Sequence, residues 1–368
     1  TSLLIMLGKE FEEYFIYYMR KESYELVNYI IRRFLILPFI LFGVTVLVFS
    51  MIMMLGPYQR LSTYINDPAQ LKGQDMDELV SKYGLDDPWY EQYGRWLGGV
   101  VQGDFGWSES AGQPVTEAIF SRFPATLELA LFAVIPVVMG GIWLGVLSAV
   151  HHNQKFDHII RIISTIGWSF PTFVFGLLVL MVFYGILGWF PPGRLSAGAA
   201  EIVRSAEFVS YTGLNVLDGI LNLQFDVVVD SFRHLIGPIV TLSIVWWSYI
   251  LRITRSSMLE TLRKDYIRTA RAKGVAEKFV INKHARRNAL IPVVTVAGPM
   301  VLGLLGGVVI VESVFGYRGI GQYAAQAAQQ LDYSGILGVA MYFSFLLILI
   351  NLIVDVSYAV IDPRIRLE

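Results

Sequence analysis

The sequence predicts an all-α polytopic membrane protein with six transmembrane helices, and three observations support this fold class. Of the 368 residues, 55% are hydrophobic and only 16% are charged, whereas soluble domains carry roughly 25% charge. Six long runs contain no Asp, Glu, Lys or Arg, and the connections between them alternate in net charge. The six runs are Phe34–Gln59, Leu129–Gln154, Ile162–Gly193, His234–Leu251, Asn288–Val311 and Tyr333–Val354.

Each charge-free run is long enough to cross a bilayer. The runs have 18 to 32 residues, and about 20 residues at 1.5 Å each span a hydrocarbon core of about 30 Å. In lipid the backbone must satisfy its own hydrogen bonds, so runs of this length are expected to be helices. A buried core helix of a soluble protein would explain one such run but not six.

The connections give the orientation through their basic residues. Arg252–Arg287 holds 11 basic and 3 acidic residues, whereas Arg60–Phe123 holds 5 basic and 10 acidic residues. Cytoplasmic connections carry an excess of Lys and Arg, so the basic segment is expected in the cytoplasm. With six spans, both termini are then cytoplasmic, and the acidic segment lies outside.

These boundaries divide the chain into five parts. We expect the N-terminal part to be an interfacial amphipathic helix or an extension of the first span. The parts are the cytoplasmic or interfacial segment 1–33, the first transmembrane helix 34–56, the extracytoplasmic loop region 57–122, the five-helix core 123–361 with its extracytoplasmic segment 191–233 and cytoplasmic region 252–288, and the cytoplasmic tail 362–368.

The cytoplasmic region 252–288 has a helix–glycine–helix pattern. Asp265 is a candidate N-cap for a short helix that ends at Gly274, where glycine permits a left-handed C-terminal residue. A second amphipathic helix is expected over Glu277–Asn288, and Pro292 lies in the first turn of span five. Small residues beside Arg and Lys favour a protein docking surface. The alternative is a basic loop that only obeys the positive-inside rule.

The motifs of several enzyme classes are absent from the sequence. Without cysteine there is no disulfide scaffold, no Cys-ligated metal site and no thiol nucleophile. The only Gly-Lys pair, Gly8-Lys9, lacks the rest of a phosphate-binding loop. The five histidines lie near span ends or in cytosolic segments, where a Ser–His hydrolase or a metal site is not favoured. We therefore expect neither a catalytic site nor a metal site.

Three features of the spans have both a structural and a functional interpretation. Glu128 borders span two and is expected to cap a helix or to reach the outer interface. The run Trp246-Trp247-Ser248-Tyr249 in span four could line a solute path, although aromatic packing or an interfacial belt would also explain it. Gly140-Gly141, Gly145 and Gly303 are typical of close helix–helix packing.

Specific motifs identify a family resemblance over roughly residues 30–366. Asp265–Gly274 (DYIRTARAKG), together with His284-Ala285 and Arg287–Thr295, resembles the cytoplasmic signature of permease subunits of binding-protein-dependent ABC importers, in particular the first (B-type) permease of the dipeptide/oligopeptide group. Further matching segments are Tyr83–Asp86, Gly103–Gly106, Pro124–Leu129, Arg252–Glu260, Glu312–Phe315 and Asn351–Asp355. The sequence departs from the family pattern at Arg268-Thr269-Ala270 and at Tyr317-Arg318-Gly319.

The resemblance implies an ABC importer type I permease fold in a prokaryotic inner or plasma membrane. The implied partners are the lipid bilayer, a second (C-type) permease, two ATPase subunits or a heterodimer of them, and an extracytoplasmic solute-binding protein, with no nucleic acid. The chain would bind no cofactor, because ATP and Mg would belong to the ATPases. The implied ATPase-coupling residues are Tyr266, Ile267, Ala270, Arg271, Lys273 and Gly274.

The resemblance also bears on the solute and on the function class. Di- and oligopeptides are the expected solutes, with oligosaccharides or nickel as alternatives within the same importer architecture. A self-contained secondary transporter is the alternative from a different class. Such a carrier is expected to have acidic or His residues near the midplane of the membrane, and the charge-free runs place none there.

Overall fold

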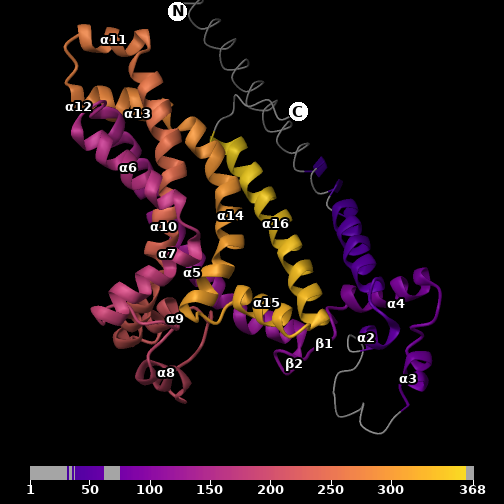
Figure 1. Cartoon of the computed structure of the whole chain (residues 1–368). Helices are drawn as coiled ribbons and strands as arrows, with labels where there is room; N and C mark the ends of the chain where they lie inside the picture. Colours follow the sequence, from indigo (N-terminus) through magenta and orange to yellow (C-terminus); the bar gives the residue numbers. More distant parts are fainter. Residues whose placement is uncertain (1–30, 33–34, 37, 62–74, 362–368) are drawn as a thin grey trace, which may run out of the picture. The chain divides into compact units, whose positions relative to one another are not determined.

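The computed structural model describes residues 31–32, 35–36, 38–61 and 75–361, which form a nearly all-helical structure (Figure 1). Most of the N-terminal segment 1–33 and the whole tail 362–368 lie outside the described residues. The chain divides into two compact units. The first comprises residues up to 56, 87–98 and those from 340 onward, and the second comprises 57–86 and 99–339.

The first unit contains an apolar helix, Pro38–Met53, that aromatic residues hold against α4 (Trp89–Val101). The Phe49 ring is buried and lies 5.2 Å from the Tyr93 ring and 5.5 Å from the Trp96 ring, centroid to centroid. The hydroxyls of Thr45 and Tyr93 are hydrogen-bonded at 2.8 Å. Since edge-on aromatic pairs add to simple burial, this contact holds the helix Pro38–Met53 against α4 around Thr45 and Phe49.

The second unit is built on two long helices that pack along each other, α5 (Val115–Val150) and α10 (Phe225–Leu262). Glycines on α5 make the close approach possible. A Cβ added at Gly140, Gly141 or Gly145 would lie 2.5, 2.7 or 2.5 Å from an atom of Trp247, Ile250 or Thr254 respectively. The prediction that these glycines are helix-packing sites is confirmed.

The third charge-free run is broken. It forms α6 (Lys155–Ser169), α7 (Thr172–Val179) and the π-helix η2 (Leu180–Ile186), and the two halves meet at 108°. Proline cannot donate to the helix and pushes the preceding residue out of the α region; Phe170, before Pro171, has φ −83° and ψ 132°. The prediction of one uninterrupted helix over Ile162–Gly193 is therefore wrong.

Three helices in the described part of the chain are long and apolar enough to cross a membrane. They are α5, α10 and the Tyr333–Leu352 part of α16 (Tyr333–Ile361), and the bent α6–η2 pair would make a fourth. Two further apolar helices are Pro38–Met53 and α14 (Ile291–Phe315), the latter with Pro292 in its first turn as predicted. The structure thus shows a multi-pass membrane protein.

Short elements connect the long helices of the second unit. Figure 1 shows α8 (Ala197–Arg204) and α9 (Asn215–Leu221) at one end of α10, and α11 (Asp265–Ala272) and α12 (Glu277–Phe279) at the other. The remaining elements are α2 (Pro57–Leu61), α3 (Met76–Lys82), the antiparallel pair β1 (Trp107–Ser108) and β2 (Gln113–Pro114) with Trp107 opposite Pro114, the π-helix η3 (Val280–Ala285), α13 (Arg286–Ala289) and α15 (Ile320–Gln329).

Candidate functional site

The predicted cytoplasmic helix is present as α11, one turn of chain beyond the end of α10. Lys264 rather than Asp265 occupies the N-cap, and no side chain bonds there, so the capping prediction is wrong by one residue. Gly274 has φ +76°, a left-handed conformation that strains other residues. It follows the last turn, with the Val275 amide donating to the Ala270 carbonyl. The glycine therefore sets where the chain turns back.

The one buried side chain of α11 packs it against the rest of the second unit. Ile267 is the only buried residue of the helix and has no exposed surface. It lies in an apolar cluster with Met258 of α10, Val280 and Ala285 of η3, and Ala149 of α5. Sequence reasoning placed Ile267 in a partner interface, but its burial in the chain's own core leaves it a positioning role.

The other predicted coupling residues lie around this anchor. Ala270 packs partly against the same cluster, whereas Tyr266 is 43% exposed and its hydroxyl accepts from the Asn288 amide at 2.9 Å. Lys273 and Gly274 are exposed. The free surface of α11 therefore consists of polar and small residues around a tyrosine ring.

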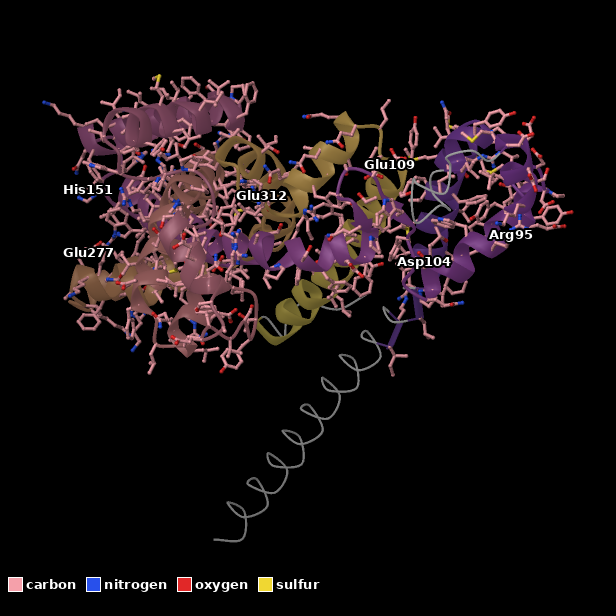
Figure 2. The ribbon with its side chains drawn as sticks, turned by 90° about the horizontal axis from the view of Figure 1, so that it is seen from below. Arg95, Asp104, Glu109, His151, Glu277 and Glu312 are labelled. Atoms are coloured by element: carbon pink, nitrogen blue, oxygen red, sulfur yellow. The ribbon has the colours of Figure 1, made fainter. Side chains whose placement is uncertain are left out.

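Arg271 forms an ion pair within the chain. Its guanidinium donates to both carboxylate oxygens of Glu277, at 2.6 and 3.1 Å, across the Gly274 turn. This hydrogen bond holds the pKa of the Glu277 carboxyl below its ordinary value and raises the pKa of Arg271. Figure 2 shows Glu277 at the same end of this unit as His151, with Glu312 well away from both. The pair braces the turn and leaves Arg271 partly neutralised.

A buried aspartate ties three helices together near the same end, and sequence reasoning missed it. Asp157 at the start of α6 has no exposed surface and accepts from Arg255 of α10 at 2.8 Å on each carboxylate oxygen. It also accepts from the Ser148 hydroxyl of α5 and from the Asn153 amide. No motif in the sequence connects Asp157 with Arg255, which lies 98 residues further along the chain.

The run Trp246–Tyr249 is mostly engaged in helix packing. A Cβ at Gly303 would lie 2.8 Å from the Trp246 ring, and the Trp247 indole donates to the Pro136 carbonyl at 2.8 Å. The Ser248 hydroxyl donates to the Ser164 carbonyl, while Tyr249 is 36% exposed and stacks on Trp168. Of the four, Ser248 is buried, Trp246 and Trp247 are partly exposed and Tyr249 is the most exposed, and the pathway role of this run stays a prediction.

Glu128 is the centre of a buried ionic network at the other end of the unit. It has no exposed surface, and Arg194 donates to its Oε2 through Nε and Nη2 at 3.0 and 2.8 Å. The Tyr317 hydroxyl donates to the same oxygen at 3.0 Å, and the Val216 amide donates to Oε1 at 2.8 Å. The expected capping role is confirmed for α9, because Val216 is the second residue of that helix and its amide has Glu128 as acceptor. The ion pair with Arg194 and the bond from Tyr317 were not expected from the sequence.

Charge and burial act together on the groups around Glu128. Burial opposes the charge of Arg194, but Glu128 and Tyr317 outweigh it and raise the pKa of Arg194. Burial and the Glu128 charge raise the pKa of the Tyr317 phenol well above its ordinary range. Arg194 therefore stays ionised and Tyr317 stays protonated, which keeps the network intact. The network holds the segment 191–233 against α5 and the turn after α14.

A second buried carboxylate, Glu312 near the end of α14, supports the following turn. The Thr126 hydroxyl donates to its Oε1 at 2.7 Å, and the Gln322 amide donates to Oε2 at 3.0 Å. A Cβ at Gly319 would lie 2.3 Å from the Glu312 carboxylate. Glycine is therefore required at the end of the turn in which this sequence departs from the family pattern.

Comparison with known proteins places this arrangement in a family. The family model described as "Binding-protein-dependent transport system inner membrane component" matches residues 141–367. The chain is 41% identical over 339 residues to the oligopeptide transport system permease protein AppB of Bacillus subtilis (strain 168), covering 92% of this chain and 99% of the relative.

Two further relatives match over similar lengths. The dipeptide transport system permease protein DppB of Alkalihalophilus pseudofirmus is 40% identical, covering 93% of this chain and 100% of the relative. The glutathione transport system permease protein GsiC of Escherichia coli (strain K12) is 38% identical, covering 93% and 99%. The family model covers α6 to α16, including α11, whereas Glu128 precedes its first matched residue. The chain therefore belongs to the family of inner membrane components of binding-protein-dependent transport systems.

Proposed function

We propose that this chain is the B-type permease subunit of an ATP-driven ABC importer for di- or oligopeptides. The observation that carries the proposal is near-complete coverage by relatives named for oligopeptide, dipeptide and glutathione transport, at 38 to 41% identity. Peptide solutes are common to all three names. Oligosaccharides and nickel are the alternative solutes that the test below can identify.

The proposed topology has six spans with both termini in the cytoplasm. Three long apolar helices, the bent α6–η2 pair, α14 and the shorter helix Pro38–Met53 supply six crossings. The 11 basic residues of Arg252–Arg287 support a cytoplasmic location for α11. The segment that contains α8 and α9 would then face outward.

The proposed coupling element is α11 with the Gly274 turn. Its exposed surface is presented on a helix fixed by Ile267 and braced by the Arg271–Glu277 pair. A rigid helix transmits displacement from a docked partner, whereas a basic loop would absorb it. Tyr266, Ala270, Arg271, Lys273 and Gly274 are the proposed contact residues, and Ile267 holds them in place.

The remaining partners complete the importer. A second permease would form the solute pathway with this chain, and two ATPase subunits would bind ATP and Mg and act on α11. A solute-binding protein would deliver the solute at the outer face. The chain itself would bind no nucleotide, which is consistent with the lack of a phosphate-binding loop in the sequence.

A mild-detergent pull-down from native membranes tests the assembly. We expect mass spectrometry to find a second permease, one or two phosphate-loop ATPases and a binding protein. Reconstituted into liposomes, that complex should take up a labelled tripeptide only with ATP inside. A chain that is isolated alone and transports alone would instead be a secondary transporter. Uptake of an oligosaccharide or of nickel, without peptide uptake, would overturn the proposed solute.

A matched pair of glycine variants tests the coupling element. Gly274→Trp should abolish ATPase co-purification and uptake, because it places a large ring on the proposed docking surface. Gly188→Trp is the control, since Gly188 is also exposed, has φ +67° and, like Gly274, has no atom within 4 Å of an added Cβ. Equal loss in both variants would show backbone strain alone, and no loss at Gly274 would exclude α11 as the coupling element.

A further inference from the structure

A cavity of about 700 Å³ lies in the second unit beside the Glu128 network. The start of α5, helix α8, the start of α9 and the turn after α14 supply its walls. Four arginines line it: Arg122, Arg194, Arg204 and Arg318. Its volume lies within the range of about 300–1,000 Å³ typical of small-molecule sites.

The cavity has a net positive charge. Arg194 is neutralised by Glu128, and Arg122 donates to the Ala118 carbonyl and lies 4.8 Å from the centre of the Tyr323 ring. Arg204 and Arg318 are exposed, and neither forms an ion pair with any residue that the structure describes. No acidic side chain occurs among the described residues that line the cavity. Three guanidinium charges are therefore left without a carboxylate.

A buried, unpaired donor lies in the wall of the same cavity. Asn215 begins α9 and is only 6% exposed, yet its Nδ2 has no hydrogen-bond partner in the described part of the chain. Buried amide donors are almost always paired, because an unpaired one loses its hydration without compensation. Asn215 Nδ2 itself has almost no accessible surface, so Asn215 belongs to the wall and the guanidiniums are the groups that a ligand can reach.

We propose that this cavity binds the carboxylate of a small ligand, with the exposed guanidiniums of Arg318 and Arg204 as donors. A guanidinium presents two parallel N–H groups that match the two oxygens of a carboxylate. This identification rests on the proposed function: the ligand is the C-terminal carboxylate of a short peptide that has reached the outer face. The site would select for a free C-terminus before the solute enters the membrane.

Direct binding to the purified full chain in detergent tests the site. The probes are the tripeptide Ala-Ala-Ala and its C-terminal amide, measured by titration calorimetry at low salt. Because a hydrogen bond to a charged group contributes about tenfold or more in affinity, the amide should bind at least tenfold more weakly than the acid. Equal binding of the acid and the amide would overturn the proposal.

Variants locate the binding within the cavity. Arg204→Gln and Arg318→Gln should each weaken Ala-Ala-Ala binding about tenfold, whereas Arg252→Gln, an exposed arginine on α10 outside the cavity lining, should stay within about twofold. Because Arg204 and Arg318 are both exposed, neither variant removes a buried contact. Unchanged binding in Arg318→Gln, or competition by inorganic phosphate at equal affinity, would refute a carboxylate site.

The two proposals fail in distinguishable ways. Carboxylate-dependent tripeptide binding without ATP-driven peptide uptake would refute the proposed function and leave the site in place. Peptide uptake by the complex without carboxylate-dependent binding to this chain would refute the site alone.

Discussion

Replacing Ile267 with alanine should loosen α11 without unfolding the protein. Ile267 is the single buried residue of this eight-residue helix, and all its surface is covered. Its neighbours Met258, Val280 and Ala285 belong to α10 and η3, which have other contacts of their own. The truncation therefore mainly weakens the packing of α11 against α10 and η3.

The size of the effect follows from the burial. Truncating a fully buried Ile to Ala typically costs about 2–5 kcal/mol, because the lost transfer energy adds to that of the cavity. The small neighbour Ala285 and the short helix allow some collapse, which favours the lower end. About 2 kcal/mol corresponds to a factor of about 30 in an opening equilibrium.

Hydrogen exchange of the full chain in detergent measures this opening. The amides of Lys273 and Val275 donate to the Thr269 and Ala270 carbonyls, so their protection reports on the last turn of α11. In Ile267→Ala their exchange should rise about 30-fold, while the amides of α5 keep their protection.

The matched control is Arg268→Ala on the same helix. The Arg268 and Asp265 side chains are 73% and 95% exposed, so their ion pair should contribute little and exchange should change less than threefold. A similar small change in Ile267→Ala would refute the view that this residue anchors the helix. A collapse of protection throughout α5 and α10 would refute the local nature of the effect.

Three further changes test the rest of the structure. Glu128→Gln removes the counter-charge of Arg194, whose side chain is 22% exposed, and should lower the free energy of unfolding by about 3–5 kcal/mol. This loss should appear as a lower thermal midpoint, whereas Glu117→Gln at an exposed site on the same helix should leave the midpoint unchanged. Equal midpoints in the two variants would show that the pair is dispensable. Gly141→Val adds atoms where even a Cβ would lie 2.7 Å from Ile250, so it should destabilise the α5–α10 contact by about 1–3 kcal/mol. Gly98→Ala, with no atom within 4 Å of the added Cβ, should leave the stability unchanged. Unchanged stability in Gly141→Val would mean that the two helices can separate freely. The hydrogen bond from Arg271 lowers the pKa of the Glu277 carboxyl, so its stabilisation is present above the unfolded pKa of about 4.3 and is lost as the pH falls through the folded value. On acidification, amide exchange around Gly274, measured relative to the intrinsic exchange rate at each pH, should increase in the wild type and not in Glu277→Gln. An identical response in both would contradict the linkage.

Local signals in the sequence were sufficient for much of the helical structure. Gly274 predicted the end of α11, because only a residue without a Cβ adopts φ +76° without strain. The glycines of α5 predicted a close helix contact, and Pro292 predicted the first turn of α14. Pro171 carried the signal for the break in the third run, but hydropathy alone does not register backbone geometry, so the run was read as one helix.

The buried charges could not be predicted in the same way. Glu128 and Arg194 are 66 residues apart in the chain, as Asp157 and Arg255 are 98 apart, and a sequence shows neither partner. The sequence therefore indicated only a helix cap or the outer interface for Glu128, and it gave no role to Asp157. Pairing with a guanidinium made complete burial possible instead, and that depends on how α5, α6 and α10 pack.

The sequence by itself determined that this is a multi-pass helical membrane protein with a short helix in a basic segment that ends at Gly274, because apolar length, charge asymmetry and glycine positions act locally along the chain. Only the tertiary structure decided which residue anchors that helix, which carboxylates are buried in ion pairs, and that four arginines line one cavity. The physical reason is that burial and pairing are properties of segments brought together by packing. A side chain's neighbours across the fold, rather than along the chain, set its energy.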